Sequence, residues 1–180
     1  MSTASDLAPH HVGRKERIYE SLLSENNYEV TEIEGRLPEG LSGTLFRIGP
    51  GKFEVGQTRL STIFEGDGMV SRFILDGNGV HFTNRYVRTQ QFTDGLRHGR
   101  LRRPGLATLA PWRVFGNLGP PANVANTNIV PLAGEMLACW EFGNPHRLDP
   151  DTLETLGTTD FDAALGYLGA FSAHPKWDAE

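Results

Sequence analysis

The chain has 180 residues, a formal net charge of −5 and 38% hydrophobic residues, and it contains 21 glycines and 11 prolines. This length suits one domain with a core of its own. The glycine and proline content favours many turns over long helices, so we predict an all-β fold. The acidic balance argues against nucleic acid as a partner, and the single cysteine, Cys139, excludes an internal disulfide bond and a thiolate metal cluster.

The chain carries no sequence signal for membrane insertion or secretion. No apolar run approaches the roughly 20 residues that a membrane-spanning helix needs. Residues 1–11 lack the apolar core of a signal peptide. We therefore expect a cytoplasmic protein.

Residues 1–27 are predicted to form an N-terminal arm ahead of the main domain, which covers residues 28–180. Within residues 14–26 the apolar side chains, Leu22 and Leu23 among them, recur at helical spacing with charged residues between them. This pattern predicts a short amphipathic helix in the arm.

Segments of alternating or continuous apolar residues, bounded by turn residues, predict at least seven strands. They cover residues 28–34, 42–48, 60–65, 69–75, 80–89, 125–132 and 135–142. We expect the second of these strands to end at the chain breakers Gly49-Pro50-Gly51. The pattern fits a sandwich, a barrel or a propeller, and periodicity alone does not choose among them.

The strands at 60–65, 69–75 and 80–89 are predicted to form an antiparallel meander, because hairpin-turn residues separate them. The first turn, Gly66-Asp67-Gly68, could also be part of a cation loop. One aspartate offers too few hard ligands for calcium, so we prefer the hairpin turn. Near the C-terminus, residues 159–166 are predicted to form a short helix that leads into a further strand.

Residues 101–119 show no clear period and mix proline, glycine, aromatic residues and arginine. Two interpretations remain open: a loop folded over the sheet as part of the core, or a peripheral membrane contact in which Trp112, Phe115 and Leu118 insert beside the arginines. The basic run just before it, residues 97–103, is interpreted as a solvated loop.

His174 and Glu141 are the residues that attract attention as candidate functional groups. Pro175 pushes His174 toward extended backbone, so the imidazole is predicted to project from the end of a strand. Glu141 ends an apolar row, where a carboxylate either reaches solvent or must be paired. From the residues alone, His174 is either a structural or surface histidine or a metal ligand.

Six short segments, in their order along the chain, resemble the carotenoid cleavage oxygenases over about residues 28–180. They are Leu37-Pro38 with Leu41 and Gly43, Arg47-Ile48-Gly49-Pro50-Gly51 with Phe53-Glu54-Val55-Gly56, Phe64-Glu65-Gly66-Asp67-Gly68-Met69, Arg85-Tyr86-Val87-Arg88-Thr89, Ala125-Asn126-Thr127-Asn128, and Leu153-Glu154-Thr155-Leu156-Gly157 leading to Ala173-His174-Pro175-Lys176.

The resemblance implies a seven-bladed β-propeller, of which this chain supplies the opening blades, with few short helices. It implies an Fe(2+) ion held by four histidines, with His174 as one ligand and Glu141 as the carboxylate that hydrogen-bonds a ligand histidine. The implied activity is dioxygen-dependent cleavage of a conjugated double bond in an apolar polyene or a stilbene. Two alternatives stay open: retinyl-ester isomerohydrolase chemistry on the same scaffold, and a β-rich binding or structural module without metal.

The chain departs from the family pattern in two ways. Thr62 and Glu65 stand where relatives often have histidine and aspartate, at positions that are not iron ligands in the family. Relatives also continue well beyond residue 180, where the other three iron ligands lie. None of the remaining histidines (His10, His11, His81, His98 and His146, the last of which is placed in a turn) is predicted to replace them. We therefore expect the 180 residues alone to be inactive.

Overall fold

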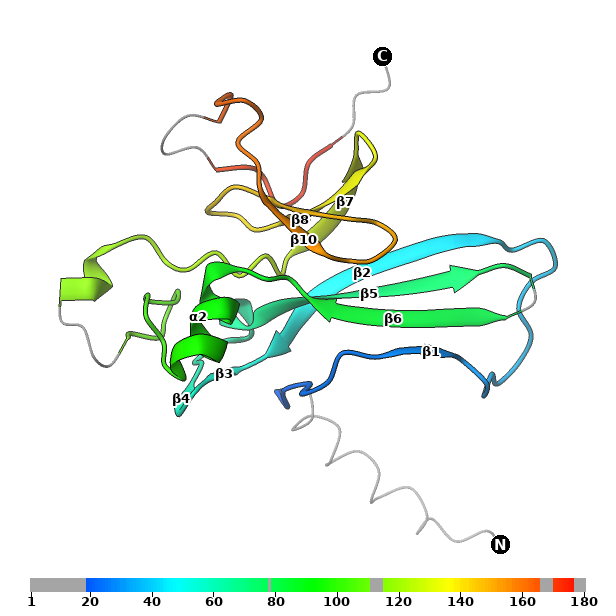
Figure 1. Cartoon of the computed structure of the whole chain (residues 1–180), viewed down its shortest axis with the longest axis horizontal. Helices are drawn as coiled ribbons and strands as arrows, with labels where there is room; N and C mark the ends of the chain where they lie inside the picture. Colours follow the sequence, from blue (N-terminus) through cyan, green and yellow to red (C-terminus); the bar gives the residue numbers. More distant parts are fainter. Residues whose placement is uncertain (1–18, 78, 111–114, 166–169, 177–180) are drawn as a thin grey trace, which may run out of the picture.

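A computed structural model describes residues 19–77, 79–110, 115–165 and 170–176, and two four-stranded antiparallel sheets dominate it (Figure 1). The first sheet has the order β1 (Asn27–Glu29), β6 (Val80–Tyr86), β5 (Asp67–Leu75), β2 (Gly43–Lys52). The second has the order β10 (Thr155–Thr158), β9 (His146–Leu148), β8 (Glu135–Cys139), β7 (Asn128–Leu132). A short ribbon pairs β3 (Glu54–Val55) with β4 (Thr58–Arg59). The prediction of an all-β fold is confirmed.

The helical elements of the described residues are few and short. They are α2 (Gln90–His98) and the 3-10 turns η1 (Ile63–Glu65) and η2 (Phe115–Leu118). The sequence analysis missed α2, which begins at the cap Thr89, whose side chain accepts the Phe92 N–H, and ends at Gly99 with φ 61°. The basic run at 97–103 is therefore partly helical rather than a loop throughout.

The main core lies where the two sheets meet. Val70 and Val87 from the first sheet and its flank pack with Ala138 and Leu148 of the second. Gly68 closes this seam: its N–H donates to the Val124 carbonyl over 2.9 Å, and a Cβ at this position would lie 2.1 Å from the Ala125 carbonyl oxygen. No residue with a side chain fits there without moving the backbone.

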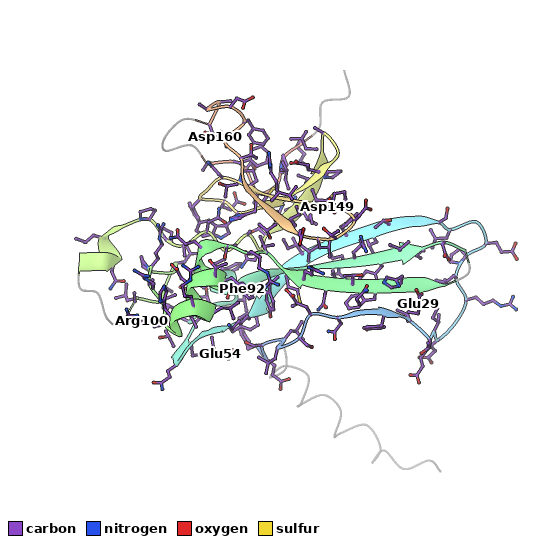
Figure 2. The ribbon with its side chains drawn as sticks, viewed as in Figure 1. Glu29, Glu54, Phe92, Arg100, Asp149 and Asp160 are labelled. Atoms are coloured by element: carbon purple, nitrogen blue, oxygen red, sulfur yellow. The ribbon has the colours of Figure 1, made fainter. Side chains whose placement is uncertain are left out.

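Polar contacts also join the two sheets. Arg72 of β5 is nine-tenths buried, and its Nη1 donates to the Pro150 carbonyl over 2.9 Å and to the Asp151 carbonyl. Both carbonyls belong to the turn between β9 and β10, which Asp149 holds by accepting the Thr152 N–H over 2.7 Å. In Figure 2, Asp149 lies where the second sheet approaches the first.

The predicted meander is wrong in its first strand. Residues 60–65 contain η1 at Ile63–Glu65 and no strand, and Gly66-Asp67-Gly68 runs from the end of η1 into β5 rather than forming a hairpin turn. The strand beside β5 is β2, which continues through Gly49-Pro50-Gly51 to Lys52. The proline is tolerated because β2 is an edge strand of its sheet, with a register shift between Pro50 and Lys52.

The predicted helix at 14–26 is wrong over its described part, residues 19–26; residues 1–18 lie outside the described residues. This segment runs along the first sheet instead (Figure 1). The Leu22 N–H donates to the Gly51 carbonyl over 2.7 Å, and the Tyr86 hydroxyl donates to the Leu22 carbonyl over 2.6 Å. These bonds to the sheet take the backbone groups that a helix would use internally.

The predicted hairpin at 125–142 is confirmed as β7 and β8, joined by Ala133 and Gly134 at φ 50° and 85°. These angles are those of a primed turn. The helix predicted at 159–166 is wrong: Phe161, Asp162 and Ala163 have φ of 53°, 56° and 68°, which is the left-handed region. Gly166 lies outside the described residues.

Candidate metal centre

Glu141 lies in the turn that follows β8. The strand ends at Cys139, and the next residue, Trp140, is 3% exposed and packs edge-on against Phe142 with ring centroids 5.3 Å apart. Both faces of β8 are buried, but Glu141 lies beyond the end of the strand, in a turn, where its side chain is exposed. Its carboxylate is therefore presented at the end of the sheet, with the strand as its support.

His174 lies in the described segment 170–176, which contains no strand, so the predicted strand at this position is wrong. The Phe171 N–H of this segment donates to the carbonyl of Gly143, in the turn between β8 and β9, over 3.4 Å. Ala173 also anchors the segment, since its fully buried side chain packs with Val130 and Leu137. One anchored residue places its neighbour, His174, at the edge of the sheet.

The structure brings the two predicted site residues together. The His174 Nε2 lies 3.9 Å from the Glu141 Oε1, and the Ala173 N–H donates to the Glu141 Oε2 over 3.4 Å. Ser172 adds a cap, because its Oγ accepts the His174 N–H over 3.2 Å. Glu141 thus faces the imidazole with one oxygen and holds the preceding backbone with the other.

Both side chains are accessible: 67% of the His174 side chain and 47% of the Glu141 side chain are exposed. The neighbouring thiol of Cys139 is fully buried, and burial and the charge of Glu141 raise its pKa to about 11. An accessible imidazole beside a carboxylate has the donor set of one metal-bound histidine and its hydrogen-bond partner. The pair fits one ligand position of an all-histidine iron site.

The other histidines of the described residues lie on other elements of the fold. His81 lies between Glu29 and Asn27, with both ring nitrogens 2.6 Å from an oxygen. His98 lies in α2, 3.1 Å from Arg102. His146 starts β9 and is 6% exposed, so its predicted place in a turn is wrong. Within the described ranges, no group of three or more His, Cys, Asp or Glu side chains is arranged to hold a metal; His10 and His11 lie outside them.

Glu65 forms a second carboxylate centre, which the sequence analysis noted only as a departure from the family pattern. Its Oε1 accepts the Ala107 and Thr108 N–H groups over 2.8 and 2.7 Å, and its Oε2 accepts the Thr62 N–H over 3.0 Å and the Thr108 hydroxyl over 2.9 Å. Burial alone would raise the pKa of Glu65, but these bonds outweigh it and hold the pKa below its usual range.

Two kinds of contact hold the irregular loop at 101–119: the hydrogen bonds from Ala107 and Thr108 to Glu65, and apolar packing. Leu101 and Ala110 pack in a core cluster with Val55 and Leu60, so this part of the loop is core. Other apolar side chains of the loop face outward: Leu109 is 65% and Leu118 83% exposed. Trp112 lies outside the described residues, as do residues 113 and 114, and the membrane contact predicted for this loop stays a prediction.

The family model described as retinal pigment epithelial membrane protein matches residues 19–180. The chain belongs to this family. Apocarotenoid-15,15'-oxygenase of Synechocystis is 40% identical over 167 residues, which are 90% of this chain and 34% of that protein. Isoeugenol monooxygenase of Pseudomonas nitroreducens is 36% identical over 83% of this chain and 30% of that protein. The chain therefore spans about a third of the length of these relatives.

The solved structure of the cobalt-substituted Synechocystis enzyme matches 89% of this chain and 34% of its own, with a TM-score of 0.81 and 39% identity. The family membership confirms the resemblance to carotenoid cleavage oxygenases. The two four-stranded sheets are blades of a partial β-propeller. The described part of the chain has no helix long and apolar enough to cross a membrane.

Solved variants of the Synechocystis enzyme point to the same part of the chain. They replace a glutamate, the tryptophan directly before it, and a threonine thirteen positions ahead of that tryptophan. The only Trp-Glu step in this sequence is Trp140-Glu141, and the same spacing places Thr127 ahead of it. The sequence analysis named Thr127 only as part of a family segment; it lies just before β7 and donates its N–H to the Cys139 carbonyl over 3.2 Å.

Proposed function

We propose that the chain is part of a non-haem iron(II) dioxygenase that cleaves a conjugated carbon–carbon double bond in a carotenoid, apocarotenoid or stilbene-like substrate. The observation that carries the proposal is the approach of Glu141 to His174, in a chain 40% identical to an apocarotenoid oxygenase. Relatives named for isoeugenol and resveratrol support substrates in which the double bond is conjugated with an aromatic ring. Dioxygen and an apolar polyene or stilbene would be the partners.

In this proposal His174 provides one imidazole ligand. Glu141, whose Oε1 faces the His174 Nε2 at 3.9 Å, would accept a hydrogen bond from a ligand histidine, which would fix the tautomer and return negative charge to a shell of neutral ligands. Its bond to the Ala173 N–H holds the backbone that carries the histidine. When bound, ferrous iron supplies dioxygen activation at positions that the imidazoles leave open. Because the described residues bring one imidazole to this place, we propose that the 180 residues alone do not catalyse the reaction.

A chimera tests the proposal. Residues 19–180 would replace the matching third of the Synechocystis enzyme, and iron content and cleavage of an apocarotenoid under air would be measured. We expect about one iron per chain and cleavage in the chimera, and loss of both with His174→Ala. His98→Gln, at the end of α2, is the matched control and should change neither. Full iron content and activity in the His174→Ala chimera would contradict the assignment.

We also propose that the loop at 101–119 contacts membranes, since apolar substrates partition into bilayers. The outward Leu106, Leu109 and Leu118, which are 47%, 65% and 83% exposed, support this. Co-sedimentation with vesicles of phosphatidylcholine and phosphatidylserine should fall when Leu109 and Leu118 are replaced by Ser. Replacing the exposed Leu156 of β10 is the control. Equal binding of both variants would remove the loop as the contact.

A further inference from the structure

Three consecutive residues after β10 adopt backbone angles that residues other than glycine rarely adopt. Phe161, Asp162 and Ala163 have φ of 53°, 56° and 68°. The left-handed conformation crowds the Cβ atom against the backbone, so non-glycine residues visit it singly rather than in runs. Such a run persists only where the surrounding structure holds it, and strained segments of this kind cluster at functional sites.

Hydrogen bonds tie this left-handed turn to the turn between β8 and β9, which also carries Glu141. The Thr159 N–H donates to the Pro145 carbonyl over 3.1 Å, and the Thr159 hydroxyl accepts the Phe161 N–H over 3.1 Å. Within the turn, the Ala164 N–H donates to the Phe161 carbonyl over 3.1 Å. Because Pro145 is fully buried, the turn is anchored to the core of the protein.

The left-handed turn places the Phe161 ring against the ring of Phe171. Their centroids lie 5.3 Å apart, and both rings pack against the buried cluster that contains Ala173. Asp162 and Ala163 are exposed, so the strained run does not serve to bury their own side chains. Its structural result is the contact between the two rings.

Phe171 belongs to the segment that carries His174. Its N–H donates to the Gly143 carbonyl over 3.4 Å, and the Ala173 N–H donates to the Glu141 Oε2 over 3.4 Å. Both bonds are long for N–H···O hydrogen bonds, and residues 170–176 contain no strand. Apolar contacts of this segment therefore carry much of the placement of His174, and the ring of Phe171 offers a larger apolar surface than the methyl group of Ala173.

We propose that Phe161 and Phe171 are positioning residues for the metal site. Their ring contact, which the left-handed turn produces, sets the place of His174 beside Glu141 through the backbone of residues 171–174. That this site binds a metal rests on the proposed function, whereas the placement of His174 is a property of the chain itself. Ordinary core packing is the competing role, and it would stabilise the whole second sheet to the same extent.

The exposed position of Ala163 allows the turn to be tested without altering the core. Ala163→Gly accepts a positive φ without strain, whereas Ala163→Val opposes it because its side chain is branched at the Cβ atom. Amide hydrogen exchange and the nuclear Overhauser effect between the two phenylalanine rings would be measured by NMR on the full chain without metal. We expect Ala163→Val to weaken the ring-to-ring effect and to speed exchange of the Ala173 N–H about tenfold. Ala163→Gly should preserve the ring contact, with exchange equal to or slower than in the unaltered chain. Equal behaviour of the two variants would overturn the role of the turn.

Variants of the ring separate positioning from core packing. Phe161→Ala should speed exchange of the Ala173 N–H about tenfold while the Ala138 N–H of β8 changes less than about twofold. Phe161→Leu, which keeps an apolar side chain, should restore much of the protection. An equal rise at Ala173 and Ala138 would indicate core packing and overturn the proposal, as would an unchanged rate at Ala173. If Phe161→Ala does not fold, the Ala163 pair still decides.

The chimera with the Synechocystis enzyme links the placement to metal binding. Iron titration should show affinity about three- to tenfold weaker in Phe161→Ala, with recovery in Phe161→Leu. Unchanged affinity beside a faster exchange at Ala173 would overturn the positioning role. A chimera of unaltered sequence that binds no iron would instead contradict the proposed function, because the exchange measurements on the metal-free chain do not depend on it.

Discussion

Glu65 and Glu141 stand at comparable places, each close to the end of an element, yet their surroundings are opposite. Glu65 is 2% exposed, and both of its oxygens are occupied by N–H and O–H donors of its own chain. The Glu141 side chain is 47% exposed and has one backbone N–H and a facing imidazole. A carboxylate whose acceptor sites are filled stabilises the fold, whereas one with open sites is available for chemistry.

The comparison predicts the largest loss of stability from Glu65→Gln. The substitution removes the charge and places an amide donor against the Ser61 and Thr62 N–H groups, so we expect a loss of about 4 kcal/mol in the free energy of unfolding. Urea denaturation measures it, with exposed Glu39→Gln as the control. Glu65→Asp should fall between the two. A change below about 0.5 kcal/mol for Glu65→Gln would show that the loop is held by other contacts.

The pH dependence of this contribution follows from the direction of the shift. The pKa of Glu65 is lowered in the folded state, so its stabilisation is complete above the ordinary value of 4.5 and is lost as the pH falls through the folded pKa.

Asp67, two residues further on, is predicted to show the opposite pH dependence. Burial raises its pKa to about 6 from 3.8, although the Gln91 amide and the charge of Lys52 act to lower it. The folded state then binds the proton more tightly than the unfolded state, so stability falls by about 3 kcal/mol as the pH rises from 4 to 6. Asp67→Asn should remove this slope in unfolding measurements across that window. An unchanged slope would assign the titration to another group.

Thr108→Val is expected to have an intermediate effect. The threonine hydroxyl donates to the Glu65 Oε2 over 2.9 Å and accepts the Ser61 N–H over 2.8 Å, while its own N–H stays bonded to Glu65. Losing the hydroxyl alone should cost about 1.5 kcal/mol of unfolding free energy. Leu109→Ala, at the next and exposed position, is the control. An equal loss for both variants would indicate a general response of the loop.

Glu141→Gln should have the smallest effect on stability, within about 0.5 kcal/mol, because its carboxylate is half exposed. Its effect should appear instead in the iron-loaded chimera, as a loss of metal affinity of about 10- to 100-fold. Thermal unfolding and iron titration of the same preparation measure both. Unchanged iron affinity would mean that Glu141, like Glu65, supports the fold and not the metal site.

The strands that the sequence predicted well are long and joined by short turns, such as β7 and β8 around Ala133-Gly134. Strands of three or four residues, β9 and β10, are too short for a period to be visible. The missed helix α2 did have end signals in Thr89 and Gly99. The three left-handed residues from Phe161 could not be foreseen, since non-glycine residues rarely adopt this conformation.

The roles of His174 as a metal ligand and of Glu141 as the partner of a ligand histidine were expected from the family resemblance rather than from periodicity; that Glu141 approaches His174 itself comes from the structure. Alternation along the strand indicated only that Glu141 ends an apolar row. The bond from the Ala173 N–H to the carboxylate depends on how residues 170–176 return to the sheet, and no local pattern encodes that path. The cavity that Gln91 and His146 line, between the start of α2 and the turn after β8, could not be predicted from the sequence either, because the residues that line it come together only in the folded chain.

The outer strand of the first sheet has a consequence for the order of folding. β1 pairs with β6, with Asn27 opposite Thr83, so this sheet closes only after more than fifty further residues have been made. The second sheet is a sequential meander of neighbours. Loop-closure entropy favours the local pairings first. We expect pulsed hydrogen exchange during refolding to protect β7 and β8 before β1. The N-terminal strand β1 would then be the last strand to pair in its sheet.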